Sequence, residues 1–291
     1  MMRLKTAAIA CAFLAVGTPL CAAPAAPGAT AQPAAEPVVL TPHRAYYTLK
    51  LAQSSGNRAV SSVRGMILYD FSGNSCDGYS LKFRQVSDLD SAEGQDAFSD
   101  LSSTTWEDGA AKKFRFSSEN KLNQQPPEKV EGQAERSGEG VGIALSKPDN
   151  KSIKVPLNLV FPTEHMRKII AAARAGKKVL EVVVYDGSDT GDKLFNTLTV
   201  IGHPIAPGAN VPSDVAGKAP ELAALTRWPV TVSYFERNAK AEREGEETPA
   251  YSITFELYEN GISRALMLNY SDFSISGELT SLDVMKPKPC K

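Results

Sequence analysis

Histidine and cysteine, on which most metal sites and many catalytic sites depend, are scarce: this chain of 291 residues has three histidines and four cysteines. His43, His165 and His203 are far apart, and none has a second histidine or cysteine at the spacing of a metal site. The sequence also lacks a nucleophile elbow, a phosphate-binding loop and the glycine pattern of dinucleotide-binding folds. We therefore predict no catalytic residue, no cofactor and no metal ligand.

Long apolar runs are also rare, and the most pronounced one lies near the start of the chain. It covers residues 6–16 and follows Arg3 and Lys5, which is the arrangement of a secretory signal peptide. It is too short to cross a hydrocarbon core of about 30 Å, and no later run is longer. We predict a protein of the periplasm, with no integral membrane segment after cleavage. Its expected parts are a signal peptide over residues 1–25, cleaved between residues 23 and 31, a disordered Ala/Pro-rich leader over residues 26–37 and a single β-rich domain over residues 38–291.

Cleavage of the signal peptide would leave two of the four cysteines. Cys11 and Cys21 lie before the expected cleavage site; Cys21 could instead carry a lipid anchor, although Leu20 stands where such signals need a small residue. Cys76 and Cys290 remain, and an isolated pair in an oxidising compartment predicts one disulfide bond. Two unrelated buried thiols are the alternative. The bond would hold the last strand against the first third of the chain.

The charge of the mature chain gives no sign of a polyanionic partner. Without Arg3 and Lys5, 30 basic residues stand against 33 acidic ones, a net charge of −3. Nucleic acid and anionic membrane surfaces are therefore not expected partners.

The dominant pattern is an alternation of apolar and polar residues with period two, which predicts half-buried antiparallel strands. It is clearest in residues 43–51, 79–84, 113–116, 251–257 and 265–270. Turn sequences separate these runs, and Asn260-Gly261 predicts a hairpin with a type I′ turn. We expect about a dozen strands. That number is too large for a flat open sheet, so we predict an all-β fold in which a long antiparallel sheet coils into a barrel or into two packed halves.

Three segments depart from this pattern. Residues 162–176 predict one helix of about three turns, with Thr163 as its N-cap and Gly176 as its stop. Residues 178–186 are rich in valine and predict a central strand. Residues 204–220 form a Pro/Gly/Ala-rich connection, long enough to be functional or mobile.

The loop of residues 186–192, called the acidic loop below, is the candidate for carboxylate chemistry. Asp189-Thr190-Gly191 has the letters of an aspartic protease motif, but that mechanism needs two such carboxylates and no second copy is present. Asp186, Asp189 and Asp192 could instead hold a weak Ca²⁺ ion. The plain alternative is a solvated hairpin loop.

Taken together, several motifs resemble those of one known family. They are Cys76-Asp77-Gly78-Tyr79 with a cysteine at the C-terminal end, Pro162-Thr163-Glu164-His165, Tyr185-Asp186-Gly187-Ser188-Asp189, Ser233-Tyr234-Phe235 and residues 268–279. In order and spacing, over about residues 38–290, the chain resembles the cell envelope integrity protein B family of alphaproteobacterial periplasmic proteins. The resemblance implies a monomer whose antiparallel sheet curls into an open spiral around the helix and is closed by the cysteine bridge, with a general shape similar to periplasmic carriers of lipoproteins. It also implies a role in envelope integrity and no catalytic residues.

Two functions of different classes follow from these observations. The first is a non-enzymatic periplasmic protein that binds a lipid, a lipoprotein or a protein partner on the curled sheet. Its groove would include Tyr47, Phe83, Phe116, Tyr251 and Phe255, although residues of this kind are more often plain core. The alternative is a carboxylate-dependent hydrolase or a calcium-binding module that uses the acidic loop.

Overall fold

The structure is a computed structural model that describes residues 36–55, 60–91, 94, 96–237 and 248–290. The predicted signal peptide and nearly all of the predicted leader lie outside these residues. The described chain forms fifteen β-strands, one α-helix and one 3-10 helix. In order they are β1 (His43–Ser54), β2 (Val60–Asn74), β3 (Gly78–Ser91), β4 (Ala97–Glu107), β5 (Lys113–Leu122), β6 (Glu128–Ser137), β7 (Gly140–Lys147), β8 (Lys151–Val155), β9 (Leu159–Val160), α1 (Pro162–Arg174), β10 (Val179–Val184), β11 (Phe195–Ile201), η1 (Val215–Lys218), β12 (Arg227–Glu236), β13 (Tyr251–Tyr258), β14 (Ser263–Asn269) and β15 (Phe273–Val284).

All strands of the described chain belong to one sheet, in which most strands pair with their neighbours in sequence. β1 joins the first and last parts of the chain, because it pairs with β2 on one side and with β15 on the other. β9 departs from the antiparallel pattern and pairs in parallel with β10 across α1. The predicted all-β class with one helix is confirmed, with more strands than we expected. No helix of the described residues is long and apolar enough to cross a membrane.

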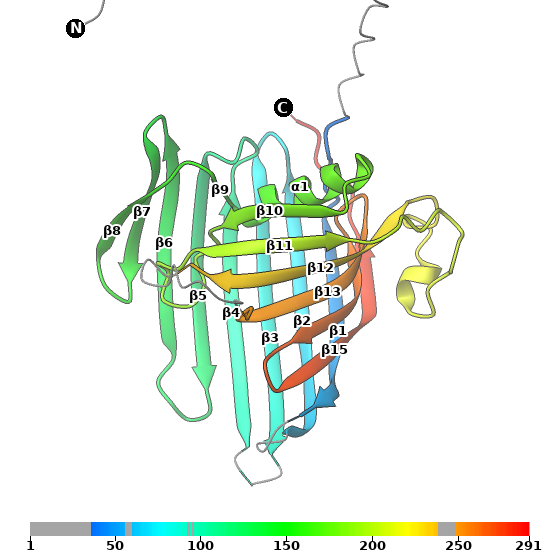
Figure 1. Ribbon diagram of the computed structural model, residues 1–291, viewed down its shortest axis with the longest axis horizontal. Coiled ribbons are helices and arrows are strands. Elements are labelled where there is room, and N and C mark those ends of the chain that lie inside the picture. Colours follow the sequence, from blue (N-terminus) through cyan, green and yellow to red (C-terminus); the bar gives the residue numbers. More distant parts are fainter. Residues whose placement is uncertain (1–35, 56–59, 92–93, 95, 238–247, 291) are drawn as a thin grey trace, which may run out of the picture. The chain divides into compact units, whose positions relative to one another are not determined.

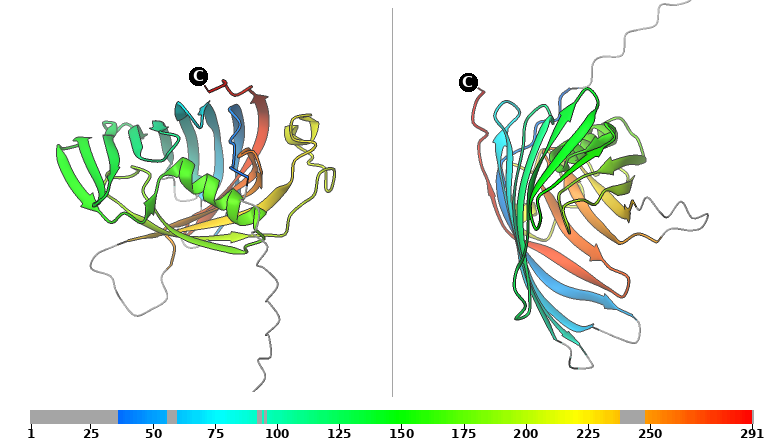
Figure 2. Two further views of the ribbon diagram at one scale, coloured as in Figure 1. Left: turned by 90° about the horizontal axis from the view of Figure 1, so that it is seen from above. Right: turned by 90° about the vertical axis from the view of Figure 1, so that its left-hand side faces the viewer.

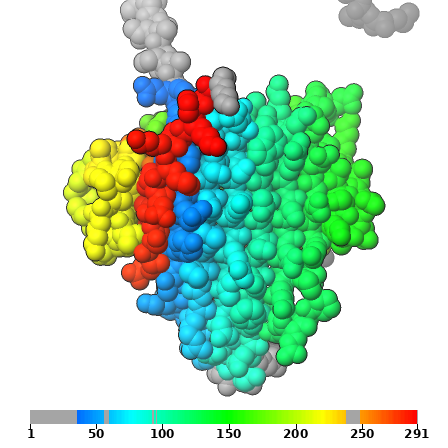
Figure 3. All heavy atoms as spheres, turned by 180° about the vertical axis from the view of Figure 1, so that it is seen from behind, coloured from blue at the N-terminus to red at the C-terminus, as the bar shows by residue number. Residues whose placement is uncertain are grey.

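The sheet curls back on itself, although hydrogen bonds do not close it into a barrel. Its edge strands, β8 and β9, are separated in the chain by residues 156–158 alone. Such a short link keeps the two edges within about 15 Å of each other. In Figures 1 and 2, β10 to β13 run across the strands of the first half, and α1 lies at one end of the space between the halves. Figure 3 shows the other side, where β15, β1 and the following strands form a continuous outer wall.

Glycines beside Leu49 allow the central strands to approach closely. Leu49 of β1 lies opposite Gly65 of β2 and Gly277 of β15. A Cβ atom on Gly65 would lie 2.3 Å from the carbonyl oxygen of Val86 and 3.3 Å from the Leu49 side chain. A Cβ atom on Gly277 would lie 3.4 Å from the Leu49 side chain. The buried Leu49 side chain therefore fills space that side chains on the neighbouring strands would need.

The predicted disulfide bond between Cys76 and Cys290 is present, with the two Cα atoms 5.7 Å apart. Cys76 lies in the turn between β2 and β3. The Asn74 side-chain oxygen accepts hydrogen bonds from the backbone N–H groups of Cys76 (2.8 Å) and Asp77 (2.7 Å). The Asn74 amide nitrogen donates to the carbonyl of Lys288 at 3.2 Å. The turn is thus organised to receive the C-terminal tail.

The helix α1 confirms the predicted element but corrects its start. Its N-cap residue is Phe161, which makes no side-chain capping bond, and Thr163 lies inside the first turn. The prediction was wrong because the Phe161 ring stacks on Phe114 in the core, with ring centroids 5.3 Å apart, and Pro162 is suited to the first helical position. The predicted stop is confirmed: Gly176 has a φ of 71°, the left-handed conformation that commonly ends helices.

Two further predictions need correction. The β13–β14 hairpin forms at Asn260-Gly261, but only Gly261 has positive φ, at 91°. The Gly261 N–H donates to the carbonyl of Tyr258, so a type I turn followed by one left-handed residue replaces the type I′ turn. The valine-rich strand β10 is not central: it is the second strand from the edge and is covered there only by the two residues of β9.

Candidate functional site

A cavity of about 630 Å³ lies inside the curled sheet. Inward-facing residues of β1 to β6 line it on one side, and residues of β12 to β14 line it on the other. The first turns of α1 and the acidic loop complete its wall. The cavity exists because the two halves of the sheet curl around a space that their side chains do not fill.

The five aromatic residues that the sequence suggested for a groove all line this cavity. They are Tyr47 of β1, Phe83 of β3, Phe116 of β5, Tyr251 and Phe255 of β13. Their positions follow from the period-two alternation, which turns every second residue of each strand to the inside. The Tyr47 hydroxyl donates to the backbone carbonyl of Ser263 at 2.8 Å, so its polar atom is satisfied and the ring serves as apolar wall.

The helical end of the cavity depends on a carboxylate from β4. The Glu107 oxygens accept hydrogen bonds from the backbone N–H groups of Thr163 (2.7 Å) and Glu164 (2.8 Å), which caps α1. Burial raises the pKa of Glu107 to about 7, although these two N–H groups lower it. His165 faces the cavity with an Nε2 atom that has no hydrogen-bond partner, and burial lowers its pKa to about 4. The imidazole is therefore neutral near neutral pH.

The acidic loop lies at another part of the cavity wall, and its three carboxylates have different surroundings. Asp186 lines the cavity, and its Oδ1 accepts a hydrogen bond from the Ser188 backbone N–H at 2.9 Å. Asp189 also lines it, but pairs with Lys193. Asp192 pairs with Lys151. Within the residues that the structure describes, no cluster of three or more histidine, cysteine or acidic residues is arranged to hold a metal ion.

Glycine allows the acidic loop to approach the cavity closely. Gly187 has a φ of 68°, and a Cβ atom there would lie 2.5 Å from the Phe116 ring. The loop backbone is thus packed directly against an aromatic residue of the cavity wall. Tyr185, fully buried just before the loop, donates from its hydroxyl to the carbonyl of Gly191 at 2.8 Å and fixes the other end of the loop.

Aromatic side chains gather near Asp186. Tyr234 and Tyr251 face each other on β12 and β13 and stack with ring centroids 4.6 Å apart. Phe195 of β11 contacts both rings edge-on. Burial and, to a smaller extent, the negative charge of Asp186 raise the pKa of Tyr234. The pKa of Tyr251 is also raised, first by burial and then by Tyr234, Asp186 and Tyr270.

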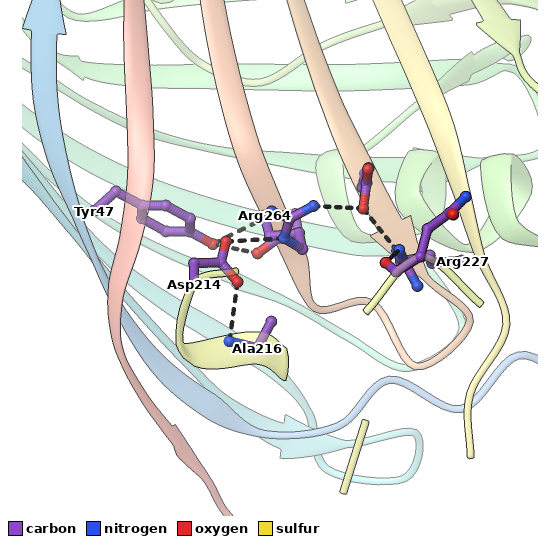
Figure 4. Close-up of polar contacts among 8 residues, drawn as sticks. Tyr47, Asp214, Ala216, Arg227 and Arg264 are labelled. Atoms are coloured by element: carbon purple, nitrogen blue, oxygen red, sulfur yellow. Dashed lines mark hydrogen bonds and ion pairs between the residues drawn. The ribbon is translucent and has the colours of Figure 1, made fainter. Parts of the chain in front are cut away.

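The connection between β11 and β12 is docked on the sheet by ionic contacts that the sequence analysis missed (Figure 4). The Asp214 carboxylate accepts a hydrogen bond from Arg264 at 2.8 Å and another from the Ala216 backbone N–H at 3.1 Å. Glu256 accepts hydrogen bonds from both Arg264 (2.6 Å) and Arg227 (2.7 Å). The exposed fractions of the Asp214 and Arg227 side chains are only 5%. This network joins four residues of alternating charge.

The same connection contributes to the hydrophobic core. Ala216 and Leu222 are buried in one cluster with Tyr47 and Leu268. The predicted long connection is therefore an ordered part of the fold. None of the four charged residues of the network lines the cavity.

Comparison with known proteins gives a consistent result. The family model described as EipB-like matches residues 34–286. The cell envelope integrity protein EipB of Brucella abortus (strain 2308) is 35% identical over 256 residues, which is 88% of this chain and 88% of that protein. The crystal structure of a β-barrel-like protein of a domain of unknown function, also from Brucella abortus, superimposes with a TM-score of 0.77 at 33% identity. The superposition covers 86% of this chain and 100% of the solved chain.

Proposed function

Because this chain belongs to the EipB-like family, we propose that it is a periplasmic binding protein that supports cell envelope integrity by holding the apolar part of an amphiphile in its cavity. The name of the Brucella relative supports the envelope role. The cavity is the observation that supports binding, because it is lined largely by aromatic and aliphatic side chains. Its volume of about 630 Å³ lies within the range of roughly 300–1,000 Å³ that small-molecule sites occupy.

The occupant in this proposal is a single acyl chain, supplied by a lipid or by a lipidated protein. Residues from both halves of the sheet, such as Phe83 and Phe255, line one continuous space, which suits an extended apolar chain. Burial of each methylene group would contribute about 0.8 kcal/mol. A protein partner on the outer wall is the alternative if the test below finds that nothing occupies the cavity.

We propose binding rather than catalysis because the acidic loop has its charges separately engaged. Asp189 and Asp192 each pair with a lysine. A shared-proton carboxylate pair or a calcium site would need those oxygens to converge on one atom.

We further propose that the protein is a monomer and that a signal peptide, residues 1–25, is removed on export, with the exact cleavage point between residues 23 and 31. N-terminal sequencing of the periplasmic protein tests the last point.

The test of the binding role is to fill the cavity from one strand. Ser103 of β4 lines the cavity, whereas its neighbour Ser102 is exposed on the other face of the strand. We expect the uncharged fluorophore N-phenyl-1-naphthylamine to bind the wild-type protein saturably. Ser103→Trp should abolish this binding, and the matched control Ser102→Trp should retain it. Equal binding by both variants would show that the fluorophore, and by extension an acyl chain, does not occupy the cavity.

A further inference from the structure

Asp186 is a carboxylate that lies deep in the protein, lines the cavity and has no cationic partner among the described residues. Burial, the largest influence, raises its pKa. Its neighbours in the acidic loop, Asp189 and Asp192, pair with lysines, but no ion pair of the described residues includes Asp186. The side chain still keeps accessible surface, because it faces the cavity. A buried carboxylate is costly unless an opposite charge accompanies it.

The rest of the cavity wall does not supply that opposite charge. The described residues that line it include no lysine and no arginine. His43 and His165 are the two basic groups in the wall, and burial lowers the pKa of both, so that they are neutral near neutral pH. Glu128 lies at the exposed rim of the lining and adds further negative charge. The wall is therefore electrostatically unfavourable for a carboxylate or phosphate group and favourable for a cation.

The aromatic rings beside Asp186 fit the same kind of group. Tyr234 and Tyr251 line the cavity as Asp186 does, and Phe195, whose ring contacts both tyrosines, pairs with Val184, two residues before Asp186. Aromatic rings attract cations within about 6 Å of the ring centroid, because the face of the ring is electron-rich. A carboxylate with two tyrosines is thus a suitable environment for an ammonium group.

We propose that Asp186, with Tyr234 and Tyr251, binds the ammonium head group of a single-chain amphiphile whose apolar chain occupies the remainder of the cavity. This inference rests on the proposed function and adds the charge of the ligand. Uncharged amphiphiles bind more weakly through the chain alone. Amphiphiles with an anionic head group bind most weakly, because Asp186 repels them and no cation in the described wall compensates.

The test compares three amphiphiles with the same dodecyl chain, each below its critical micelle concentration at about pH 8. They are dodecyltrimethylammonium, the uncharged dodecyldimethylamine oxide and dodecanoate. Isothermal titration calorimetry of the full mature protein should give a dissociation constant about tenfold lower for the ammonium compound than for the amine oxide, because only the ammonium compound has a net positive charge for the Asp186 carboxylate and the tyrosine rings to attract. Dodecanoate should bind more weakly than either.

Two variants assign the preference to one carboxylate. Asp186→Asn keeps an oxygen that can accept the hydrogen bond of Ser188, so it preserves the loop while removing the charge. It should remove the preference for the ammonium compound and leave the affinity for the amine oxide unchanged. Asp192→Asn, the matched control, removes a carboxylate of the same loop that binds Lys151 and does not line the cavity. It should leave all three affinities unchanged.

The outcomes separate the two proposals. If all three amphiphiles bind the wild-type protein equally, or if Asp186→Asn keeps the preference, the head-group inference is wrong while the cavity still binds chains. If none of the three binds, or if Ser103→Trp fails to weaken them, the proposed function itself is wrong.

Discussion

Removal of the disulfide bond should destabilise the protein mainly through its unfolded state. Cys76 and Cys290 are separated by 214 positions. In the chain-entropy model, the link over so long a loop restricts the unfolded chain by about 18 cal/mol/K, or about 5 kcal/mol at 25 °C. The native state loses little, because the Met285 N–H still donates to the Pro42 carbonyl and Asn74 still binds Lys288. We expect the double variant Cys76→Ser with Cys290→Ser to lose about 2–5 kcal/mol of unfolding free energy.

Urea unfolding followed by circular dichroism measures this loss. The dependence of the free energy on urea should also become steeper, because the unlinked unfolded chain exposes more surface. Reductant provides the control: it should lower the stability of the wild-type protein and leave the double Ser variant unchanged. Equal stability of the two proteins without reductant would refute the reasoning, since an unlinked chain has the larger unfolded-state entropy whatever the native contacts are.

Three further perturbations follow from the structure. The pKa of Glu107 is raised to about 7 from an ordinary 4.5, so its contribution to stability is complete below pH 4.5 and is lost as the pH rises through 7. The pKa of His165 is lowered to about 4 from 6.5, so its contribution is complete above pH 6.5 and is lost as the pH falls through 4. In His165→Phe the dependence from Glu107 remains, so this variant should lose about 3 kcal/mol of stability between pH 4.5 and 7. In Glu107→Gln the dependence from His165 remains, so this variant should lose about 3 kcal/mol as the pH falls from 6.5 to 4. Asp214→Ala should cost about 3 kcal/mol and open the β11–β12 connection to limited proteolysis, because it leaves two largely buried arginines, Arg227 and Arg264, with Glu256 as their one shared carboxylate. Gly187→Ala should cost more than Gly208→Ala: both have positive φ, but only at the first would the new Cβ meet an aromatic ring.

Each of these predictions has a result that would contradict it. Equal pH profiles for the Glu107 and His165 variants, measured as urea midpoints, would show that neither group titrates as described. A control for Asp214 is Asp88→Ala, whose partner Arg64 is largely exposed, so its cost should stay below about 1 kcal/mol. Similar losses of stability for Asp214→Ala and Asp88→Ala would contradict the stabilising role of the buried network. Equal melting temperatures for Gly187→Ala and Gly208→Ala would contradict the steric argument.

The strands and the identity of the inward-facing residues could be predicted from the sequence, because both depend on local alternation. Tyr47, Phe83 and Phe255 were assigned to one face in this way, and all three line the cavity. The cavity itself could not be predicted, since alternation gives the face of a side chain and not the distance between the halves of a sheet. The disulfide followed from the compartment and the count of remaining cysteines.

Other features depend on contacts between distant residues and left no local signal. Glu107 caps α1 from 56 positions away, so the sequence pointed to Thr163, the nearest polar residue with a suitable side chain. The network of Asp214 and Arg264 joins residues 50 positions apart, with nothing in either segment to indicate the other. Asp186 was recognised as a candidate, but its tyrosine neighbours were not: Asp189 lines the cavity with it, and so do Tyr234 and Tyr251 from strands about 50 and 65 positions away.

The proposed binding of an amphiphile in the cavity is tested most directly by locating a heavy atom on its chain. Crystals grown with dodecyltrimethylammonium brominated at the end of the chain would give an anomalous signal from bromine. We predict one peak inside the curled sheet, among the side chains of the cavity wall, with the ammonium group beside Asp186. A peak confined to the outer wall, or no ordered bromine at a saturating concentration of the compound, would contradict the account.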